Sequence, residues 1–241
     1  MDTRYLGNEI SVIIPVFNEE RNLFPLYERL KNVLINLDRE YEIIFVDDGS
    51  KDKSFAVLRE IKDKDPNIKI IKFKRNYGQS FALDAGFRNA QGEIIVSLDA
   101  DLQNDPEDIP KLLKELASCD VVCGWRKKRF DPLSKKISSW IANFIRRLVL
   151  RDKFLDIGCT LRVYRREALE KIKLFNGLHR FLPILIEYEG FKVKQIVVKH
   201  HPRFSGKSKY KFFRRLIKPF IDLLVVYWMK RNWIRYEYEI I

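Results

Sequence analysis

The sequence has little cysteine. Its 241 residues include only three, Cys119, Cys123 and Cys159. Three cysteines at these spacings cannot build a disulfide framework, and they do not match the paired spacing of a four-ligand zinc site. The sequence therefore argues against both a disulfide-stabilised and a zinc-stabilised scaffold. We expect free thiols, buried as small apolar side chains, in a protein of a reducing compartment.

Long apolar stretches are also missing. A membrane-spanning helix needs about 20 consecutive apolar residues, and the nearest candidate, Pro219–Met229, is short and contains Asp222. The first residues, Met1–Tyr5, lack the apolar core of a signal peptide. Low-complexity tracts and solenoid repeats are absent as well. The sequence predicts a folded globular protein that does not cross a bilayer.

Acidic residues are scarce in the second half of the chain. Residues 121–241 hold 29 Lys and Arg against 10 Asp and Glu, whereas residues 1–120 hold 17 against 23. The formal net charge of the whole chain is +13. A basic half that follows an acidic half indicates a partner with phosphate groups. Nucleic acid, membrane lipid and phosphorylated small molecules all meet that condition.

Strand and helix patterns alternate along the first two-thirds of the sequence. This alternation is typical of an α/β protein with a mixed, mainly parallel sheet and helices on both faces. The predicted strands are Ile10–Pro15, Tyr41–Val46, Ile68–Phe73, Ile94–Leu98, Asp120–Cys123 and Phe191–Val198, with a further strand entered from residues 156–164. The predicted helices cover about Glu20–Leu37, Ser54–Lys64, Gln79–Ala90 and Lys127–Arg151, and another starts at Asp105 and Pro106.

Two carboxylates and an amide follow the fourth predicted strand. Asp99, Asp101 and Gln103 come directly after Ile94–Leu98. Ligands of parallel sheets bind where the strands end. Oxygen donors at that place suit Mg²⁺ or Mn²⁺, which takes further ligands from water and substrate phosphates. Taken alone, two acids at this spacing are more often an ordinary acidic turn.

Polar residues also end the first two strands. The first strand ends at Pro15 and is followed by Phe17 and Glu19, which offer an aromatic wall and an acceptor for a nucleoside. A proline–asparagine turn with a capping glutamate has the same composition. The second strand ends at Asp47 and Asp48, and adjacent buried acids are costly unless donors or a ligand compensate them. Three acid-bearing strand ends at one edge indicate a common site.

Six segments extend this pattern over residues 11–210. Together they resemble the family 2 glycosyltransferases. More narrowly, they resemble the polyprenyl-phosphate hexose synthases, a group that includes dolichol-phosphate mannose synthases and bacterial polyprenyl-phosphate glucosyltransferases. The segments are SVIIPVFNEERNL, EIIFVDDGSKDKS, RNYGQSFALDAGFRNAQGEIIVSLDADLQNDPEDIP, VVCGWR, DIGCTLRVYRRE and HHPRFSGKSKY.

The resemblance implies a GT-A fold over residues 1–210. Such a domain binds a nucleoside-diphosphate sugar, of the GDP-mannose or UDP-glucose type, together with Mg²⁺ or Mn²⁺. By position, Asp99, Asp101 and Gln103 would hold the metal. Asp101, Arg126 and Arg203 would act in catalysis. The other implied substrate contacts are Pro15, Phe17 and Glu19 at the nucleoside, Asp48 at the base or ribose, Ala100 through its backbone, Lys209 at a phosphate, and Lys135 and Ser139 near the acceptor phosphate.

One of these assignments departs from the family pattern. Lys135 stands where the mannose synthases use Arg, so bidentate contact with a phosphate is lost at that position. Asp156 is expected to orient a neighbour or to serve the structure rather than to act as a catalyst. His179 with Arg180 is a candidate contact for the sugar.

The acceptor is expected to be a polyprenyl phosphate. A phosphate monoester with a second pKa of about 6 is already ionised near neutral pH, so it can attack without a protein base. The Glu-Asp pair of hydroxyl-directed relatives is missing after Asp108, as is the Gln-x-x-Arg-Trp signature of processive synthases. We therefore expect inverting transfer of a hexose to dolichyl or undecaprenyl phosphate. One alternative is transfer to a hydroxyl of a glycan or lipid. The other is nucleic-acid binding by the basic half, which the acidic edge disfavours.

Residues 211–241 interleave Lys and Arg with aromatic residues. Amphipathic helices of this composition lie in the membrane interface, although a solvated charged face has the same pattern. We expect peripheral attachment to the cytoplasmic face of a membrane, or a soluble piece of a membrane-anchored enzyme.

Overall fold

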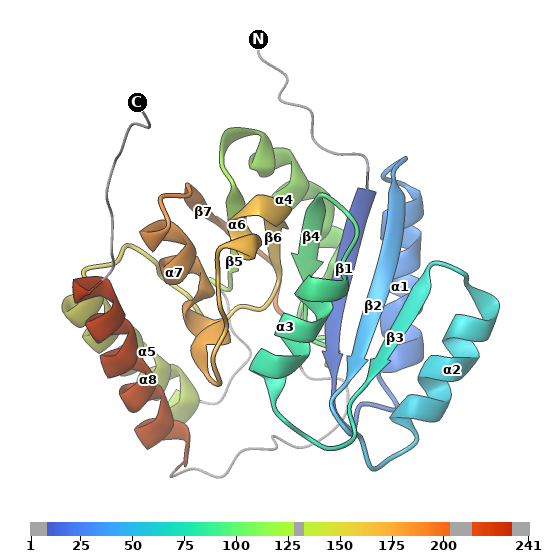
Figure 1. Ribbon diagram of the computed structural model, residues 1–241, viewed down its shortest axis with the longest axis horizontal. Helices are drawn as coiled ribbons and strands as arrows, with labels where there is room; N and C mark the ends of the chain where they lie inside the picture. Colours follow the sequence, from blue (N-terminus) through green and yellow to red (C-terminus); the bar gives the residue numbers. More distant parts are fainter. Residues whose placement is uncertain (1–8, 128–132, 203–213, 233–241) are drawn as a thin grey trace, which may run out of the picture.

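Seven strands form one sheet in the part of the chain that the computed structural model describes, residues 9–127, 133–202 and 214–232 (Figure 1). Side chains are described there except at residues 133–138 and 214–218. The strand order across the sheet is β3-β2-β1-β4-β6-β5-β7. The strands are β1 (Glu9–Val16), β2 (Glu40–Asp47), β3 (Ile68–Lys72), β4 (Ile94–Ser97), β5 (Val121–Trp125), β6 (Arg162–Arg165) and β7 (Val193–Val197).

The sheet is mixed and mainly parallel, as predicted. Strands β1 to β4 are mutually parallel, and β5 is parallel to β7. Strand β6 runs antiparallel between β4 and β5. The sequence indicated a strand after residue 156 but not its direction, because an apolar run carries no sign of the neighbour with which it will pair.

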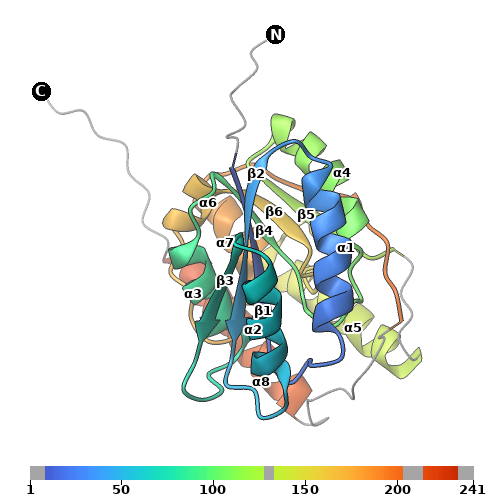
Figure 2. The same ribbon diagram turned by 90° about the vertical axis from the view of Figure 1, so that its right-hand side faces the viewer.

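Helices cover both faces of the sheet, with α1 and α4 on one side and α3 and α6 on the other (Figure 2). The predicted helices are confirmed, and within the predicted Lys127–Arg151 segment the described helix covers Leu133–Leu150. The helices are α1 (Leu23–Ile35), α2 (Ser54–Lys64), α3 (Gln79–Asn89), α4 (Ile109–Glu115), α5 (Leu133–Leu150), α6 (Arg166–Glu170), α7 (Leu182–Tyr188) and α8 (Arg214–Arg231), with 3₁₀ turns η1 (Pro106–Asp108), η2 (Leu116–Ser118) and η3 (Leu178–Phe181).

Alternation along β1 divides the core into two layers. Ile10, Val12 and Ile14 pack in the cluster that contains the buried faces of α1, α2 and α4. Ile13 belongs to the opposite cluster, with α3, α6 and α7. Side chains of a strand alternate between its two faces, so apolar residues of β1 pack on both faces of the sheet. This is expected for a parallel sheet that is covered on both sides.

Helix α7 was not predicted. Six of its seven residues are buried, so its sequence shows no polar face and no helical period. A short apolar run of this kind cannot be assigned to helix or strand by its pattern. In contrast, α1 buries Leu23, Leu26, Leu30 and Leu34 at helical spacing, and its pattern was readable.

The three cysteines are free and buried, as predicted. Burial raises the pKa of the Cys123 thiol to about 12 and that of the Cys159 thiol to about 11. Both thiols therefore stay protonated near neutral pH and act as small apolar side chains.

Helices α5 and α8 pack against each other at the lower left of Figure 1. The backbone of α8 is helical within the segment predicted to be an amphipathic tail. Within residues 9–127, 133–202 and 214–232, no helix combines the length and apolar character needed to cross a membrane.

Candidate active site

The loops after β1 and β2 are linked by hydrogen bonds at the carboxyl edge of the sheet. The Asn18 backbone N–H donates to Ser50 Oγ at 3.0 Å, and the Lys51 N–H donates back to Asn18 Oδ1 at 2.7 Å. The Glu19 N–H donates to Ser54 Oγ at 2.8 Å. The residues predicted to contact the nucleoside, Pro15 in β1 and Phe17 and Glu19 in the loop after it, are all half-buried.

Asp48 organises a third loop, the one between β3 and α3. Its Oδ1 accepts the Tyr77 N–H at 2.7 Å, and its Oδ2 accepts the Gly78 N–H at 2.9 Å and Asn76 Nδ2 at 2.8 Å. Burial raises the pKa of the Asp48 carboxyl and the Asp47 charge adds to the rise, whereas the two N–H donors lower it. The adjacent acids at this strand end are thus compensated in part by donors from the chain itself.

The backbones of two of these loops touch at Gly49. A Cβ atom placed on Gly49 would lie 2.4 Å from the Arg75 carbonyl carbon and 2.7 Å from the Asn76 nitrogen. Gly49 also has a φ of +69°, a conformation that residues with a side chain rarely adopt. Only glycine therefore lets residue 49 approach the loop that Asp48 holds.

The acidic segment follows β4 at the same edge. Gln79 Nε2 donates to Asp99 Oδ1 at 2.7 Å, and the Gln103 N–H donates to Asp101 Oδ1 at 3.2 Å. Ala100 and Asp101 are buried, and Leu102 has a φ of +60° that turns the chain. The structure thus brings Asp99, Ala100, Asp101 and Gln103 together in one short turn.

The donor set of this turn fits Mg²⁺ or Mn²⁺. It offers two carboxylates and one side-chain amide oxygen, all hard oxygen donors. Among the described residues, no group of three or more His, Cys, Asp or Glu side chains is placed to hold a metal ion. Mg²⁺ is usually bound by one or two carboxylates together with water and substrate phosphates.

Arg126, at the end of β5, is held by Asp156. Its Nε and Nη2 donate to the two Asp156 oxygens at 2.8 and 2.9 Å, and the Arg126 N–H donates at 3.3 Å. Gly158 N–H donates to Asp156 Oδ1 at 2.9 Å. Asp156 therefore orients Arg126, which is the role expected from the sequence.

Other predicted residues are placed only in part. Ser139 lies on α5 and is half-buried. Lys135 lies on the same helix, but its side chain is outside the described residues, and Arg203 and Lys209 are outside them altogether.

His179 is buried next to α3. Its Nδ1 lies 2.7 Å from Ser80 Oγ, which also accepts the Gly177 N–H at 2.9 Å. Ser80 and Gln79 were not singled out from the sequence. The sequence feature that points to them is their position at the start of a predicted helix. They directly follow the loop whose backbone N–H groups donate to Asp48.

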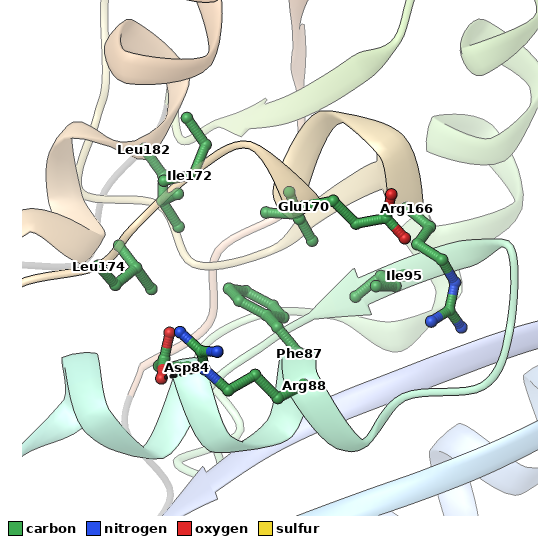
Figure 3. Close-up of a pocket in the computed structure, with 10 residues that line it drawn as sticks. Asp84, Phe87, Arg88, Ile95, Arg166, Glu170, Ile172, Leu174 and Leu182 are labelled. Carbon is green, nitrogen blue, oxygen red and sulfur yellow. Dashed lines mark hydrogen bonds and ion pairs between the residues drawn. The ribbon is translucent and has the colours of Figure 1, made fainter.

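A pocket of about 250 Å³ lies elsewhere, between α3, α6 and the segment that follows α6 (Figure 3). Phe87 and Ile95 contribute apolar lining, and Asp84 and Arg88 form an ion pair at 2.7 Å on its wall. Ile95 is near the beginning of β4, whereas Asp99 follows its end. The pocket therefore belongs to the opposite end of that strand, and none of the predicted site residues lines it.

Comparison with known proteins connects these features to a family. A model of glycosyl transferase family 2 matches residues 11–173. The chain is 37% identical over 229 residues to a dodecaprenyl-phosphate galacturonate synthase of Rhizobium johnstonii, covering 92% of this chain and 68% of that protein. It is 42% identical over 218 residues to an undecaprenyl-phosphate 4-deoxy-4-formamido-L-arabinose transferase of Photorhabdus laumondii, covering 90% and 67%. The chain spans about two thirds of the length of these relatives.

Solved structures confirm the predicted GT-A fold. Glucosyl-3-phosphoglycerate synthase from Mycobacterium tuberculosis, with Mn²⁺, uridine diphosphate and phosphoglyceric acid, matches 95% of this chain and 80% of its own at a TM-score of 0.71 and 16% identity. A mannosyltransferase from Pyrobaculum calidifontis, with GDP-mannose and Mn²⁺, matches 98% and 67% at a TM-score of 0.63 and 20% identity. At these identities the likeness concerns the fold alone.

The contact at Gly49 yields a prediction for stability. Gly49→Ala should lower the free energy of unfolding by about 3 kcal/mol or more, because it adds a backbone clash to the strain of a positive φ. Gly190→Ala is the matched control, since Gly190 has a φ of +92° with open space around it. That control should cost about 1 kcal/mol from strain alone. Urea unfolding measures both, and equal losses would show that the loops can separate freely.

Proposed function

The chain belongs to glycosyl transferase family 2, and from that premise we propose that it transfers a sugar from a nucleoside-diphosphate sugar to a polyprenyl phosphate. It is a glycosyltransferase. The acceptor class is supported by the names of the two relatives, which specify dodecaprenyl and undecaprenyl phosphate. The observation that carries the proposal is the position of Asp99 and Asp101 in a turn beside the linked loops of the carboxyl edge.

The donor sugar we favour differs from the mannose or glucose expected from the sequence. The relatives are named for galacturonate and for 4-deoxy-4-formamido-L-arabinose. The first is a hexuronic acid and the second a modified pentose. We therefore propose a uronic acid or a 4-substituted arabinose as the transferred sugar.

Substrate binding is proposed to follow the strand ends. Phe17 and Glu19 would contact the nucleoside, with Pro15 shaping the exit from β1 and Asp48 holding the loop that borders the same side. Asp99, Asp101 and Gln103 would hold Mg²⁺ or Mn²⁺. A cation there would neutralise charge on the departing nucleoside diphosphate.

The transfer is proposed to be a direct displacement with inversion. An acceptor phosphate oxygen forms a bond to the anomeric carbon, while the bond from that carbon to the diphosphate breaks and the diphosphate keeps the electron pair. Arg126 is proposed to stabilise phosphate charge, and its pairing with Asp156 fixes its direction before substrate arrives. Because both Asp156 oxygens accept from Arg126, that carboxylate is poorly suited to remove a proton from a hydroxyl acceptor. A phosphate acceptor requires no such base.

A lipid-linked acceptor requires a surface that meets the membrane, and we propose α5 and α8 for that role. Trp140 and Leu148 on α5 are 64% and 70% exposed, and Trp228 on α8 is 65% exposed. Exposed apolar patches of this kind mark interaction sites. Arg151 and Arg231, at the ends of the two helices, are exposed as well, and positive charge beside aromatic side chains suits anionic lipid.

An assay of the purified chain tests the reaction. UDP- and GDP-linked sugars, including UDP-galacturonate, are offered with Mn²⁺ and a short-chain prenyl phosphate. We expect an acid-labile prenyl-phosphate sugar whose anomeric proton shows the configuration opposite to that of the donor. Asp101→Asn should lower the rate by more than about 100-fold, while Asp63→Asn, an exposed acid on α2, should not. Retention of configuration, an acid-stable glycan as the product, or full activity of Asp101→Asn under chelation would contradict the proposal.

Vesicle binding tests the membrane surface. The double variant Trp140→Ser and Trp228→Ser should bind phosphatidylglycerol-containing vesicles at least about 10-fold more weakly, because apolar burial in the interface is lost. Its activity on a short-chain, water-soluble prenyl phosphate should be unchanged. Ile35→Ser is the control, since Ile35 is 57% exposed on α1. Equal vesicle binding by all three proteins would exclude this surface.

A further inference from the structure

Gln79 begins α3 and reaches across to the acidic turn that follows β4. Its side-chain amide nitrogen lies 2.7 Å from Asp99 Oδ1, a residue 20 positions further along the chain. An amide N–H is a donor without charge, so it fixes the carboxylate without neutralising it. An ionised carboxylate has about four lone-pair directions, and the Gln79 amide uses one of those of Asp99.

The two residues before Gln79 in the chain are held by hydrogen bonds to Asp48. Asp48 accepts the N–H groups of Tyr77 and Gly78, the two residues that precede it. Gly78 has a φ of +105°, which turns the chain from the loop into the helix. Gln79 therefore follows a segment whose backbone N–H groups are already hydrogen-bonded to Asp48.

The next residue is anchored as well. Ser80 Oγ accepts the Gly177 N–H at 2.9 Å and lies 2.7 Å from His179 Nδ1. Ser80 is buried, so this contact attaches the first turn of α3 to the 3₁₀ turn η3. With Asp48 on one side and η3 on the other, Gln79 has little freedom to follow Asp99 if that carboxylate rotates.

We propose that Gln79 is a positioning residue that presets Asp99 for a divalent cation. The inference rests on the proposed function, because it takes Asp99 as a metal ligand. Groups that hold a metal ligand from outside the coordination shell typically contribute 10- to 100-fold in metal affinity or activity. Through Asp48, the same loop joins the nucleoside side of the site to the diphosphate side.

Metal binding without turnover is the decisive readout. Mn²⁺ is titrated by electron paramagnetic resonance in the presence of UDP, with GDP in a parallel series. Gln79→Leu keeps the side-chain size but removes the donor, and we expect its apparent Kd for Mn²⁺ to rise about 10-fold or more. Gln79→Asn keeps an amide on a shorter chain and should show the same direction of change. Asn89→Ala, at the other end of α3, is the control and should bind Mn²⁺ like the unmodified chain.

Kinetics separate positioning from a structural role. For Gln79→Leu, the Mn²⁺ concentration for half-maximal rate should rise about as much as the Kd, and kcat should largely recover at saturating Mn²⁺. Mn²⁺ affinity within about twofold of the unmodified chain in both Gln79 variants would overturn the inference. If the unmodified chain transfers sugar in that case, the proposed function stands without it. If the variants lose Mn²⁺ affinity but the unmodified chain forms no prenyl-phosphate sugar, the proposed function fails and the positioning role stands.

Discussion

The site depends on negative charge that is crowded at one edge of a parallel sheet. Carboxylates end β2 and follow β4, and like charges in a partly buried place are unfavourable unless donors or cations compensate them. Asp48 is compensated by N–H groups of its own chain, whereas Asp99 receives a neutral amide. The first acid is therefore committed to holding a loop. The donor that reaches the second acid from Gln79 carries no charge. This difference between two acids, at the ends of the two strands that flank β1, is what the proposed chemistry requires.

The two halves of the sequence differ in charge. The acidic first half supplies the carboxyl edge, and the basic second half supplies Arg126 together with helices α5 and α8. Pairing of Arg126 with Asp156 keeps one positive group oriented where β5 ends. The exposed apolar side chains proposed to meet the membrane are on α5 and α8. Lys135 and Ser139, the implied contacts of the acceptor phosphate, are also on α5.

Much of the fold was predictable because local sequence patterns indicate its strands and helices. The parallel strands and the helices between them follow from apolar runs and helical spacing, as in α1, and the acids of the site follow from where those strands stop. Direction and partner were not predictable for β6, since pairing is decided by distant residues. Helix α7 was missed because burial on all sides removes its period. Gln79 and Ser80 were missed because a Gln or Ser at a helix start has no chemical signature until its partner is known.

Anomalous diffraction at the manganese edge, from crystals grown with Mn²⁺ and a nucleoside diphosphate, tests the central claim most directly. The account predicts one anomalous peak in contact with carboxylate oxygens of Asp99 and Asp101 and with the diphosphate. A diphosphate bound at the carboxyl edge with no such peak, or a peak away from these two residues, would contradict it.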